Sequence, residues 1–441
     1  MQNSLIQSLS TAVLSVLFGF FGALGLLQSS GRTQRLLKFL ALVPVFLPSL
    51  FSLLIGISII NFFPMGTFGV IYFLTLIYIG FAASVLCEEM TSQLGQTGFV
   101  AEVYGLSKRL FLFKVLWPMV RKSVGFVFIT IFVNAMMAFT IPLLVGGGRG
   151  TNFEVLIYEK IFIEQNWSAA LGLSLLQLAL IAIFALLLQA RPVVSVSEFK
   201  KSRLVGSYFG LAGLVLYLSL YFWGYIKLFG GSLQVYYFAD IFNADFYTSI
   251  SQSLLLFAFC FVIFFALLLA VLFLKYSLKD TRFLNFFLNP SSVLVGFGFY
   301  LLLPSHNLWY SLLKLSLVIG VVSFVGFMKF VFENQLQLFE TQIKVARSFG
   351  LGFLSFVFTI YFPQIKKRIH YAISLLFIFC ISEFGLVKAS GAEVKTLGTV
   401  MASYLSSYRI EGAFVISTII LAIWLVAMVI SGVALGVHQK S

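Results

Sequence analysis

The chain has 441 residues, of which 60% are hydrophobic and only 10% are charged. A soluble domain carries about a quarter charged residues, so this composition excludes an ordinary soluble protein and indicates one that spans a lipid bilayer. The formal net charge of +14 would suit nucleic-acid binding, but the basic residues follow the pattern of membrane topology described below. We therefore expect no nucleic-acid partner.

Eleven apolar runs are long enough to cross a bilayer of about 30 Å as helices, and they predict an all-α polytopic membrane protein. In chain order they lie near residues 5–27, 37–61, 68–87, 123–146, 168–190, 204–230, 250–274, 284–304, 308–332, 369–388 and 412–436. No charged segment precedes the first run, so we expect it to stay as a span rather than to be removed as a signal peptide. Pro44 and Pro48 fall within the second run, where neighbouring helices can satisfy the backbone groups that a proline frees.

The basic residues are distributed unevenly between the two sides of the predicted membrane. Most of the 29 Lys and Arg residues fall in one set of loops, and the opposite set carries Arg149, Lys160, Lys388, Lys395 and Arg409. Loops rich in Lys and Arg stay in the cytoplasm. We therefore expect the N-terminus outside and the C-terminus in the cytoplasm, and the net charge is explained as an insertion signal.

Two stretches in the basic loops share one skeleton. They read AEVYGLSKRLFLFKVLWPMVRK from Ala101 and ARSFGLGFLSFVFTIYFPQIKK from Ala346. In each, a Gly follows the Ala by four residues and a Pro follows the Gly by thirteen. We expect a short helix, a Gly in the left-handed conformation, a second short helix and a Pro that starts the next span. A rigid, partly apolar element at the cytoplasmic surface suits insertion into a cleft of a soluble partner.

The two stretches lie 245 residues apart, and the same offset relates other parts of the chain. It maps SLIQSL at Ser4 onto SISQSL at Ser249, and Phe139 onto Phe384. One offset over most of the chain predicts a duplicated unit, and copies in the same orientation form two parallel repeats about an axis along the membrane normal. We place the first repeat at residues 1–203, with five spans and its loop at 92–120, and the second at residues 204–441, with six spans and its loop at 335–366.

The spacing of the two loops resembles the EAA loop of bacterial ABC-importer permeases, the coupling helix that inserts into a separate ATPase. The family pattern is Glu-Ala-Ala, three residues, Gly and a distant Pro. It is broken at the Glu, where Phe99 and Lys344 stand, and at the middle Ala, where Val100 and Val345 stand. The resemblance implies a type I ABC importer (MetI-like) fold and assigns ATPase docking to the positions that are kept: Ala101, Gly105, Pro118, Ala346, Gly350 and Pro363.

Two further stretches narrow the resemblance. FTIPLLVGGGRGTNFEVLIYEKIF from Phe139 and CISEFGLVKASGAEVKTLGTVMASYLSSYRIEGA from Cys380 look like the segments that follow these loops in thiamine permeases. Those proteins, like ferric-iron permeases, carry both halves in one chain. The resemblance covers nearly the whole chain and implies a bacterial inner-membrane subunit that translocates thiamine or its phosphates, or alternatively ferric iron. The implied partners are a dimer of a cytoplasmic ABC ATPase, which holds ATP and magnesium, and a periplasmic substrate-binding protein.

The sequence offers little for catalysis. It has no GxxxxGK[ST] pattern, so we expect a transport subunit that does not hydrolyse ATP and binds no cofactor of its own. His306, His370 and His438 lack the spacing of metal ligands, and we expect neither a metal site nor a catalytic site. An integral membrane enzyme would need clustered His, Asp or Glu at the interface, which the predicted loops do not carry.

Three residues are candidates for the substrate pathway. Glu383 is the acid set deep in a predicted span, where a carboxylate normally faces a cavity or a partner. We expect it to favour a cationic substrate, with a structural hydrogen bond as the alternative. Phe139 and Phe384 are related by the repeat and suit stacking on a flat heterocycle, against plain helix packing. An ion-coupled secondary transporter is the alternative from another class, and Glu383 is its one candidate for a coupling carboxylate.

Overall fold

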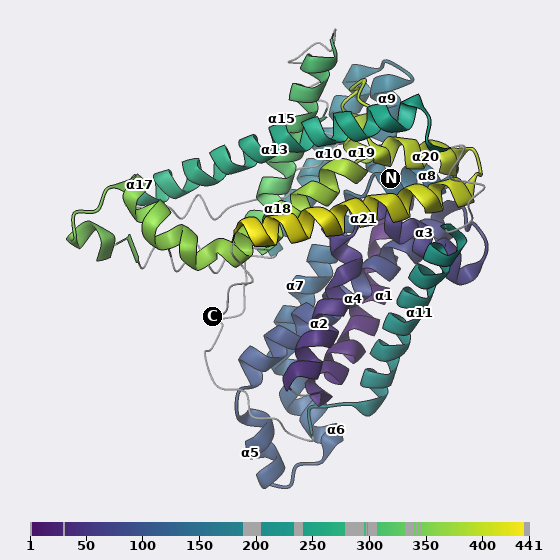
Figure 1. The fold of residues 1–441 in the computed structure, drawn as a ribbon. Coiled ribbons are helices and arrows are strands. Elements are labelled where there is room, and N and C mark those ends of the chain that lie inside the picture. The colour runs from purple at the N-terminus through teal and green to yellow at the C-terminus, as the bar shows by residue number, and fades with distance from the viewer. Residues whose placement is uncertain are drawn as a thin grey trace. The chain divides into compact units, whose positions relative to one another are not determined.

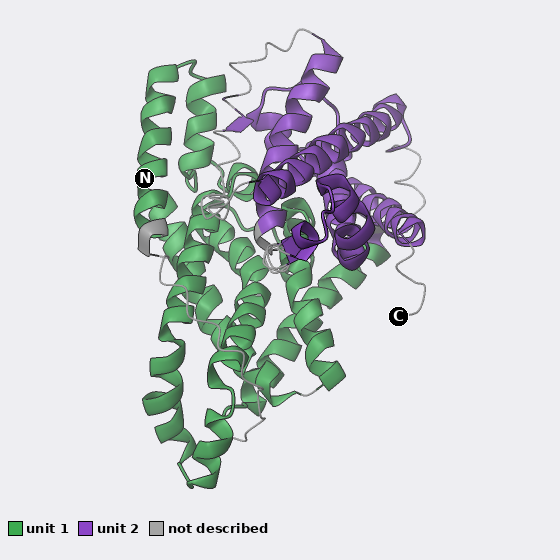
Figure 2. Ribbon diagram, turned by 90° about the vertical axis from the view of Figure 1, so that its left-hand side faces the viewer, with its two compact units in different colours: residues 1–230 green, residues 231–441 purple. Residues whose placement is uncertain are grey.

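The computed structural model describes residues 2–29, 31–187, 204–232, 241–277, 295–296, 298, 307–330, 339, 342–343 and 345–435 (Figure 1). Every regular element in these residues is a helix, which confirms the predicted all-α class for the part of the chain described. The chain forms two compact units, residues 1–230 and residues 231–441 (Figure 2).

The first unit is built around α1 and α4, which pack side by side. Gly19 of α1 lies so close to α4 that an added Cβ would be 2.4 Å from the Cβ of Ala82. Small residues of this kind let helix backbones approach one another in membrane proteins. The helices of this unit are α1 (Gln2–Gln28), α2 (Gly31–Phe46), α3 (Ser49–Ile60), α4 (Gly66–Leu94), α5 (Thr97–Val103), α6 (Lys108–Leu110), the π-helical turn η1 (Phe111–Leu116), α7 (Trp117–Met136), α8 (Thr140–Val145), α9 (Phe153–Phe162), α10 (Trp167–Leu187) and α11 (Tyr208–Ser232).

The predicted span at 37–61 differs from the structure, because it forms two helices instead of one. α2 and α3 meet at an angle of 107°. Pro48 is the residue before α3 and has an extended backbone, with φ −55° and ψ 145°. A proline cannot donate an N–H to the helix ladder, so α2 ends at this point and the run bends sharply.

Helix α11 packs in the first unit, although the repeat predicted from the sequence assigns it to the second copy. The Tyr217 hydroxyl donates a hydrogen bond of 2.8 Å to the Leu76 carbonyl of α4. Gly210 of α11 crosses α1 so closely that a Cβ would lie 2.1 Å from the Phe21 carbonyl oxygen. The boundary between the compact units falls after Gly230, whereas the boundary predicted between the repeats lies at 203/204.

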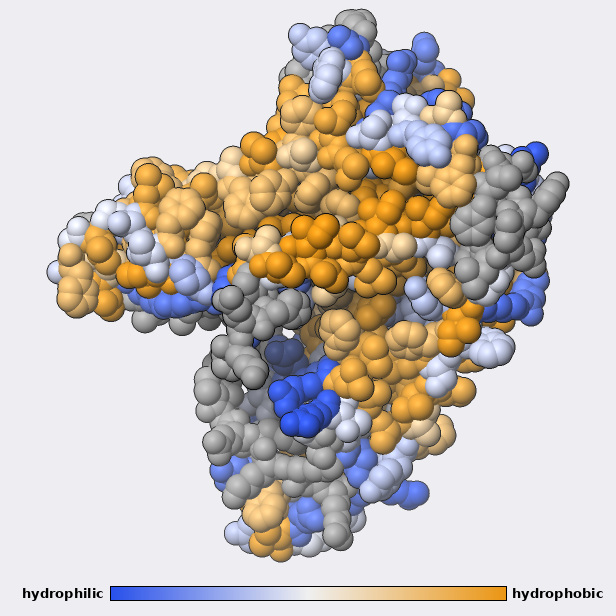
Figure 3. Space-filling view, viewed as in Figure 1, coloured by the Kyte–Doolittle hydropathy of each residue, from blue (hydrophilic) through white to orange (hydrophobic). Residues whose placement is uncertain are grey.

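The second unit has its apolar core between α13, α15 and α18. Phe264, Leu315 and Leu376 are buried there. The surface along α21 is hydrophobic and suits contact with lipid (Figure 3), and its exposed side chains include Leu425 and Val429. The helices of this unit are α13 (Ala244–Ser277), α15 (Leu308–Phe330), α17 (Phe353–Phe356), the π-helical turn η3 (Val357–Tyr361), α18 (Phe362–Ser382), α19 (Gly385–Ala389), α20 (Leu397–Ser406) and α21 (Ile410–Ala434).

Fewer spans are found in the described residues than the eleven predicted. Eight helices there are long and apolar enough to cross a membrane, and the bent pair α2–α3 makes nine at most. The predicted span at 284–304 lies almost entirely outside the described residues. The predicted span at 369–388 corresponds to the apolar part of α18 and to α19, which are separated by a break at Glu383.

The order of elements that follows each basic loop recurs in the two units. α7 and α18 start 245 residues apart, and so do α8 and α19. The next pair, α9 and α20, starts 244 residues apart, so their N-cap residues Asn152 and Thr396 are equivalent. Each of these side chains donates a hydrogen bond to the carbonyl that follows the preceding long helix, Asn152 to Ala138 and Thr396 to Glu383.

Candidate functional site

The first basic loop turns sharply at Gly105. Gly105 has φ +70°, a left-handed conformation that a residue with a Cβ rarely adopts. Its N–H donates to the Glu102 carbonyl, and the N–H of Leu106 donates to the Ala101 carbonyl, both at 3.0 Å. These two bonds are those of a Schellman motif, which closes the C-terminus of α5. Ala101 is buried, so it anchors the start of the turn in the core of the unit.

The second basic loop repeats this turn at Gly350. Gly350 has φ +66°. Its N–H donates to the Arg347 carbonyl at 3.0 Å, and the N–H of Leu351 donates to the Ala346 carbonyl at 3.1 Å. Ala346 is buried in the core of the second unit. The Ala and the Gly of the shared skeleton therefore have the same structural roles in both loops.

The shared prolines follow a π-helical turn in both units. Trp117, the residue before Pro118, donates its N–H to the Leu112 carbonyl five residues earlier. Phe362, the residue before Pro363, donates in the same way to the Val357 carbonyl. A proline lacks an N–H and its ring clashes with the carbonyl four residues earlier, and the wider π turn accommodates both effects. Pro118 and Pro363 then stand in the first turn of α7 and α18.

Each turn exposes apolar side chains beside its glycine. Tyr104 is 79% exposed and its repeat partner Phe349 is 76% exposed. Val100 and Val345, one helical turn earlier, are also exposed and lie on the same face. Exposed aromatic residues on a rigid surface element are typical of a contact with another protein.

Glu383 lies at the break between α18 and α19. It ends α18 with an extended backbone, φ −69° and ψ 122°. Its side-chain Oε1 accepts a hydrogen bond of 2.8 Å from the N–H of Leu386 in the first turn of α19. The carboxylate is half-buried and caps a short helix, which is the structural role that the sequence left as the alternative. Glu383 was predicted to lie inside one continuous span, but it lies at the break between two helices.

Phe139 and Phe384 occupy equivalent positions in the two units. Each is the residue that precedes a short helix, α8 or α19, and each is buried. The ring of Phe139 packs edge-on against Tyr158 with the centroids 5.4 Å apart. Phe139 and Phe384 are therefore buried core residues at the breaks before α8 and α19.

A fully buried acid, Glu154, was missed by the sequence analysis. It lies in the first turn of α9, and its Oε1 accepts a hydrogen bond of 2.6 Å from the side-chain amide of Gln177. Gln177 is also fully buried and lies in the middle of the apolar helix α10. A polar residue inside a spanning run was the signal in the sequence that could have pointed to this pair.

The histidines and acids do not assemble into a metal centre in the part of the chain that the structure describes. No group of three or more His, Cys, Asp or Glu side chains is placed there to hold a metal ion. His370 is buried, and its Nδ1 lies 3.0 Å from the Ser431 hydroxyl of α21.

The described residues form an all-α protein with several candidate membrane spans and one surface loop built twice. Similarity to a known permease supports the MetI-like fold for this architecture. The chain is 24% identical over 460 residues to the thiamine transport system permease protein ThiP of Haemophilus influenzae. The similarity covers 94% of this chain and 84% of that relative, and it fits a fused permease of the thiamine type. No family model matches the chain. No solved structure matches it either.

Two substitutions of Glu383 are expected to separate its capping role from a role in substrate binding. Glu383→Ala removes the acceptor for Leu386 and should lower the free energy of unfolding by about 1 kcal/mol. Glu383→Gln keeps an oxygen acceptor and should change stability by less than about 0.5 kcal/mol. Thermal unfolding of the purified protein measures both. A loss of substrate affinity in Glu383→Gln without a loss of stability would place the carboxylate in the substrate pathway.

Proposed function

We propose that this chain is the membrane permease of a binding-protein-dependent ABC importer that translocates thiamine or its phosphates across the bacterial inner membrane. The observation that carries the proposal is the pair of matched turns at Gly105 and Gly350, each rooted by a buried alanine and each presenting an exposed aromatic residue. One turn would dock on each subunit of a cytoplasmic ATPase dimer. The thiamine assignment is supported by the similarity to a permease named for a thiamine transport system.

In this proposal both turns face the cytoplasm, the N-terminus lies outside and the C-terminus lies inside, in agreement with the distribution of basic residues. A periplasmic binding protein delivers the substrate to the outer face. ATP-driven closure of the ATPase dimer moves the turns, and the two repeats alternate access between the faces. Glu383, Phe139 and Phe384 stand at the breaks that follow α7 and α18, where we place the substrate pathway.

Purification of the chain together with the ATPase and the binding protein encoded beside it tests the proposal. We expect the ATPase to co-purify stably and the reconstituted complex to take up radiolabelled thiamine only with ATP and the binding protein present. A chain that transports without an ATPase, driven by a proton or sodium gradient, would contradict the proposal. Cysteine labelling at Tyr104 and Phe349 from each side of the membrane tests the topology, and labelling from outside would refute it.

A further inference from the structure

Helix α13 is longer than the hydrocarbon core of a bilayer is thick. Its 34 residues from Ala244 to Ser277 contain neither Gly nor Pro, so no residue in it favours a hinge. At 1.5 Å per residue it is about 51 Å long, against a hydrocarbon core of about 30 Å. A displacement at one end of such a helix is therefore transmitted to the other end.

The C-terminal end of α13 holds the second turn through Tyr276. The Tyr276 hydroxyl donates a hydrogen bond of 2.7 Å to the carbonyl of Leu351, the residue that follows Gly350. The guanidinium carbon of Arg347 lies 5.1 Å from the centroid of the Tyr276 ring, within the range of a cation–π contact. The ring also packs against Phe353 of α17, with the centroids 5.6 Å apart. Tyr276 thus contacts the turn on both sides of its glycine.

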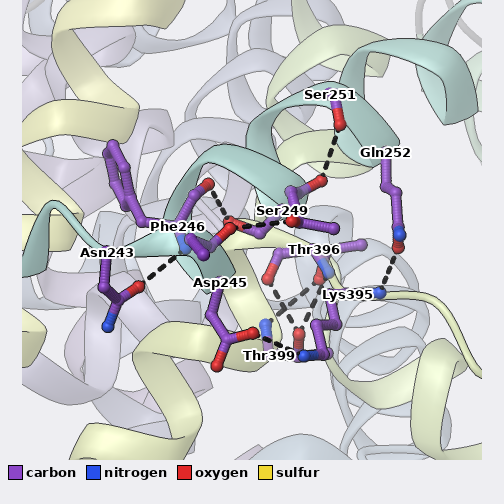
Figure 4. A network of polar contacts seen from close by, with 11 residues as sticks. Asn243, Asp245, Phe246, Ser249, Ser251, Gln252, Lys395, Thr396 and Thr399 are labelled. Carbon is purple, nitrogen blue, oxygen red and sulfur yellow. Dashed lines mark hydrogen bonds and ion pairs between the residues drawn. The ribbon is translucent and has the colours of Figure 1, made fainter.

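The N-terminal end of α13 holds the loop that precedes α20 (Figure 4). Gln252 accepts a hydrogen bond of 2.7 Å from the backbone N–H of Lys395, and the Lys395 ammonium pairs with Asp245 at 2.6 Å. Ser253 accepts from the N–H of Leu397 at 3.3 Å. The same loop reaches the break at Glu383, because the Thr396 hydroxyl donates to its carbonyl.

Helix α1 makes a corresponding connection in the first unit. Unlike α13 it contains glycines, Gly19, Gly22 and Gly25, and these are held by close packing against α4 and α11. Gln7, the repeat partner of Gln252, donates a hydrogen bond of 2.7 Å to the carbonyl of Gly150, in the loop that precedes α9 as Lys395 lies in the loop that precedes α20. At the other end of α1 the Leu24 carbonyl accepts from the N–H of Ser207 at 3.1 Å. The neighbouring Gly206 carbonyl accepts from the ammonium of Lys108, in the first basic loop, at 2.7 Å.

We propose that α13 and α1 are transmission rods that link the basic loops carrying the ATPase-docking turns to outer loops beside the substrate pathway, α13 directly through Tyr276 and α1 through the segment that holds Gly206 and Ser207. Tyr276 and Gln252 are the positioning residues of the second rod, and Lys108 and Gln7 those of the first. The inference rests on the proposed function, which sets the end that faces the ATPase. The outer contact is the same glutamine in both repeats, which explains why SLIQSL and SISQSL share their central Gln.

Tyr276→Phe tests the second rod, because it keeps the ring contacts and removes only the hydroxyl that binds Leu351. In a complex with the ATPase and binding protein in nanodiscs, we expect ATPase stimulation by thiamine-loaded binding protein to fall about fivefold, the size that one neutral hydrogen bond carries. ATPase attachment should not change. Tyr247→Phe on the same helix is the matched control, since the Tyr247 side chain is exposed; it should leave stimulation unchanged.

The direction of the outer hydrogen bonds gives a second test. Gln252 accepts from an N–H, so Gln252→Glu should keep stimulation, whereas Gln252→Leu should lower it about fivefold. Gln7 donates to a carbonyl, and a carboxylate cannot donate. Gln7→Glu should therefore lower stimulation about tenfold or more, since it leaves the buried Gly150 carbonyl without its donor. Thermal unfolding of the same variants separates the two roles, because residues that only stabilise the fold would lower stability in proportion to stimulation, whereas loss of transmission lowers stimulation alone.

Hydrogen exchange distinguishes transmission from docking. ATPase binding should alter exchange at the Lys395 and Leu397 amides in the wild-type chain and in Tyr247→Phe, and should not do so in Tyr276→Phe. Unchanged stimulation and an unchanged exchange response in Tyr276→Phe would overturn the rod. Loss of ATPase attachment in Tyr276→Phe would also overturn it, because the residue would then serve docking. Failure of the wild-type chain to bind an ATPase would instead refute the proposed function.

Discussion

Valine at both Gly105 and Gly350 is expected to reduce thiamine uptake more than tenfold while the chain remains folded in the membrane. The two glycines have φ of +70° and +66°, and a side chain in this conformation costs about 1–2 kcal/mol, more when it is β-branched. Nothing lies within 4 Å of a Cβ built at either position, so the cost is conformational and stays within the turn. Uptake by proteoliposomes and co-purification of the ATPase measure the effect.

Gly352 provides the matched control for these substitutions. It also has open space around a Cβ, but its φ of −67° and ψ of 157° are allowed for any residue. The equivalent residue in the first loop is Ser107, with φ −68° and ψ 147°. Gly352→Ser should therefore transport normally. Asn at Gly105 or Gly350 should retain more activity than Val, because Asn visits the left-handed region. Full uptake by the double Val variant would exclude the turns from docking.

Alanine at Gly210 is expected to destabilise the first unit by about 2–3 kcal/mol. A Cβ there would lie 2.1 Å from the Phe21 carbonyl oxygen, and backbone cannot move aside as a flexible side chain does. Helices α1 and α11 must separate, which has the cost of an overpacked core. Thermal unfolding of the purified protein, followed by size-exclusion chromatography, measures the loss.

Gly213 is the control on the same helix. Nothing lies within 4 Å of a Cβ at this position, so Gly213→Ala should leave stability unchanged or raise it by up to about 1 kcal/mol through helix propensity. Equal stability of Gly210→Ala and Gly213→Ala would mean that α11 does not pack closely on α1.

The basic loops were the part of the site best predicted from the sequence. A left-handed glycine and a proline at a helix start each follow from residue type, and both loops have these local conformations. The burial of Ala101 and Ala346 was not predicted. The π turns before Pro118 and Pro363 were not predicted, because a proline near a helix start is also compatible with an ordinary α-helical entry.

The positions of α11, Glu383 and Glu154 depend on tertiary contacts, which could not be predicted from the sequence. The periodicity of the repeat assigned α11 to the second copy by its position in the chain, but Gly210 and Tyr217 pack it on α1 and α4. Hydropathy placed Glu383 inside a span, whereas its carboxylate caps a short helix after a break. Glu154 was overlooked because its partner Gln177 is distant in sequence and burial cannot be read from a local pattern.

The position of α11 has a consequence for how such a chain evolves. With the predicted repeat boundary at 203/204, α11 is encoded with the second repeat but packs in the first compact unit, so neither repeat is self-sufficient. A gene split at residue 203 would produce a first polypeptide that lacks α11 and can complete its fold only by binding the second polypeptide. A split in the segment 233–240 would keep α11 with the rest of the first unit. Mutations in α11 therefore affect the folding of both halves. Fusion into one gene ensures that the half that supplies α11 and the half that needs it are made in equal amounts.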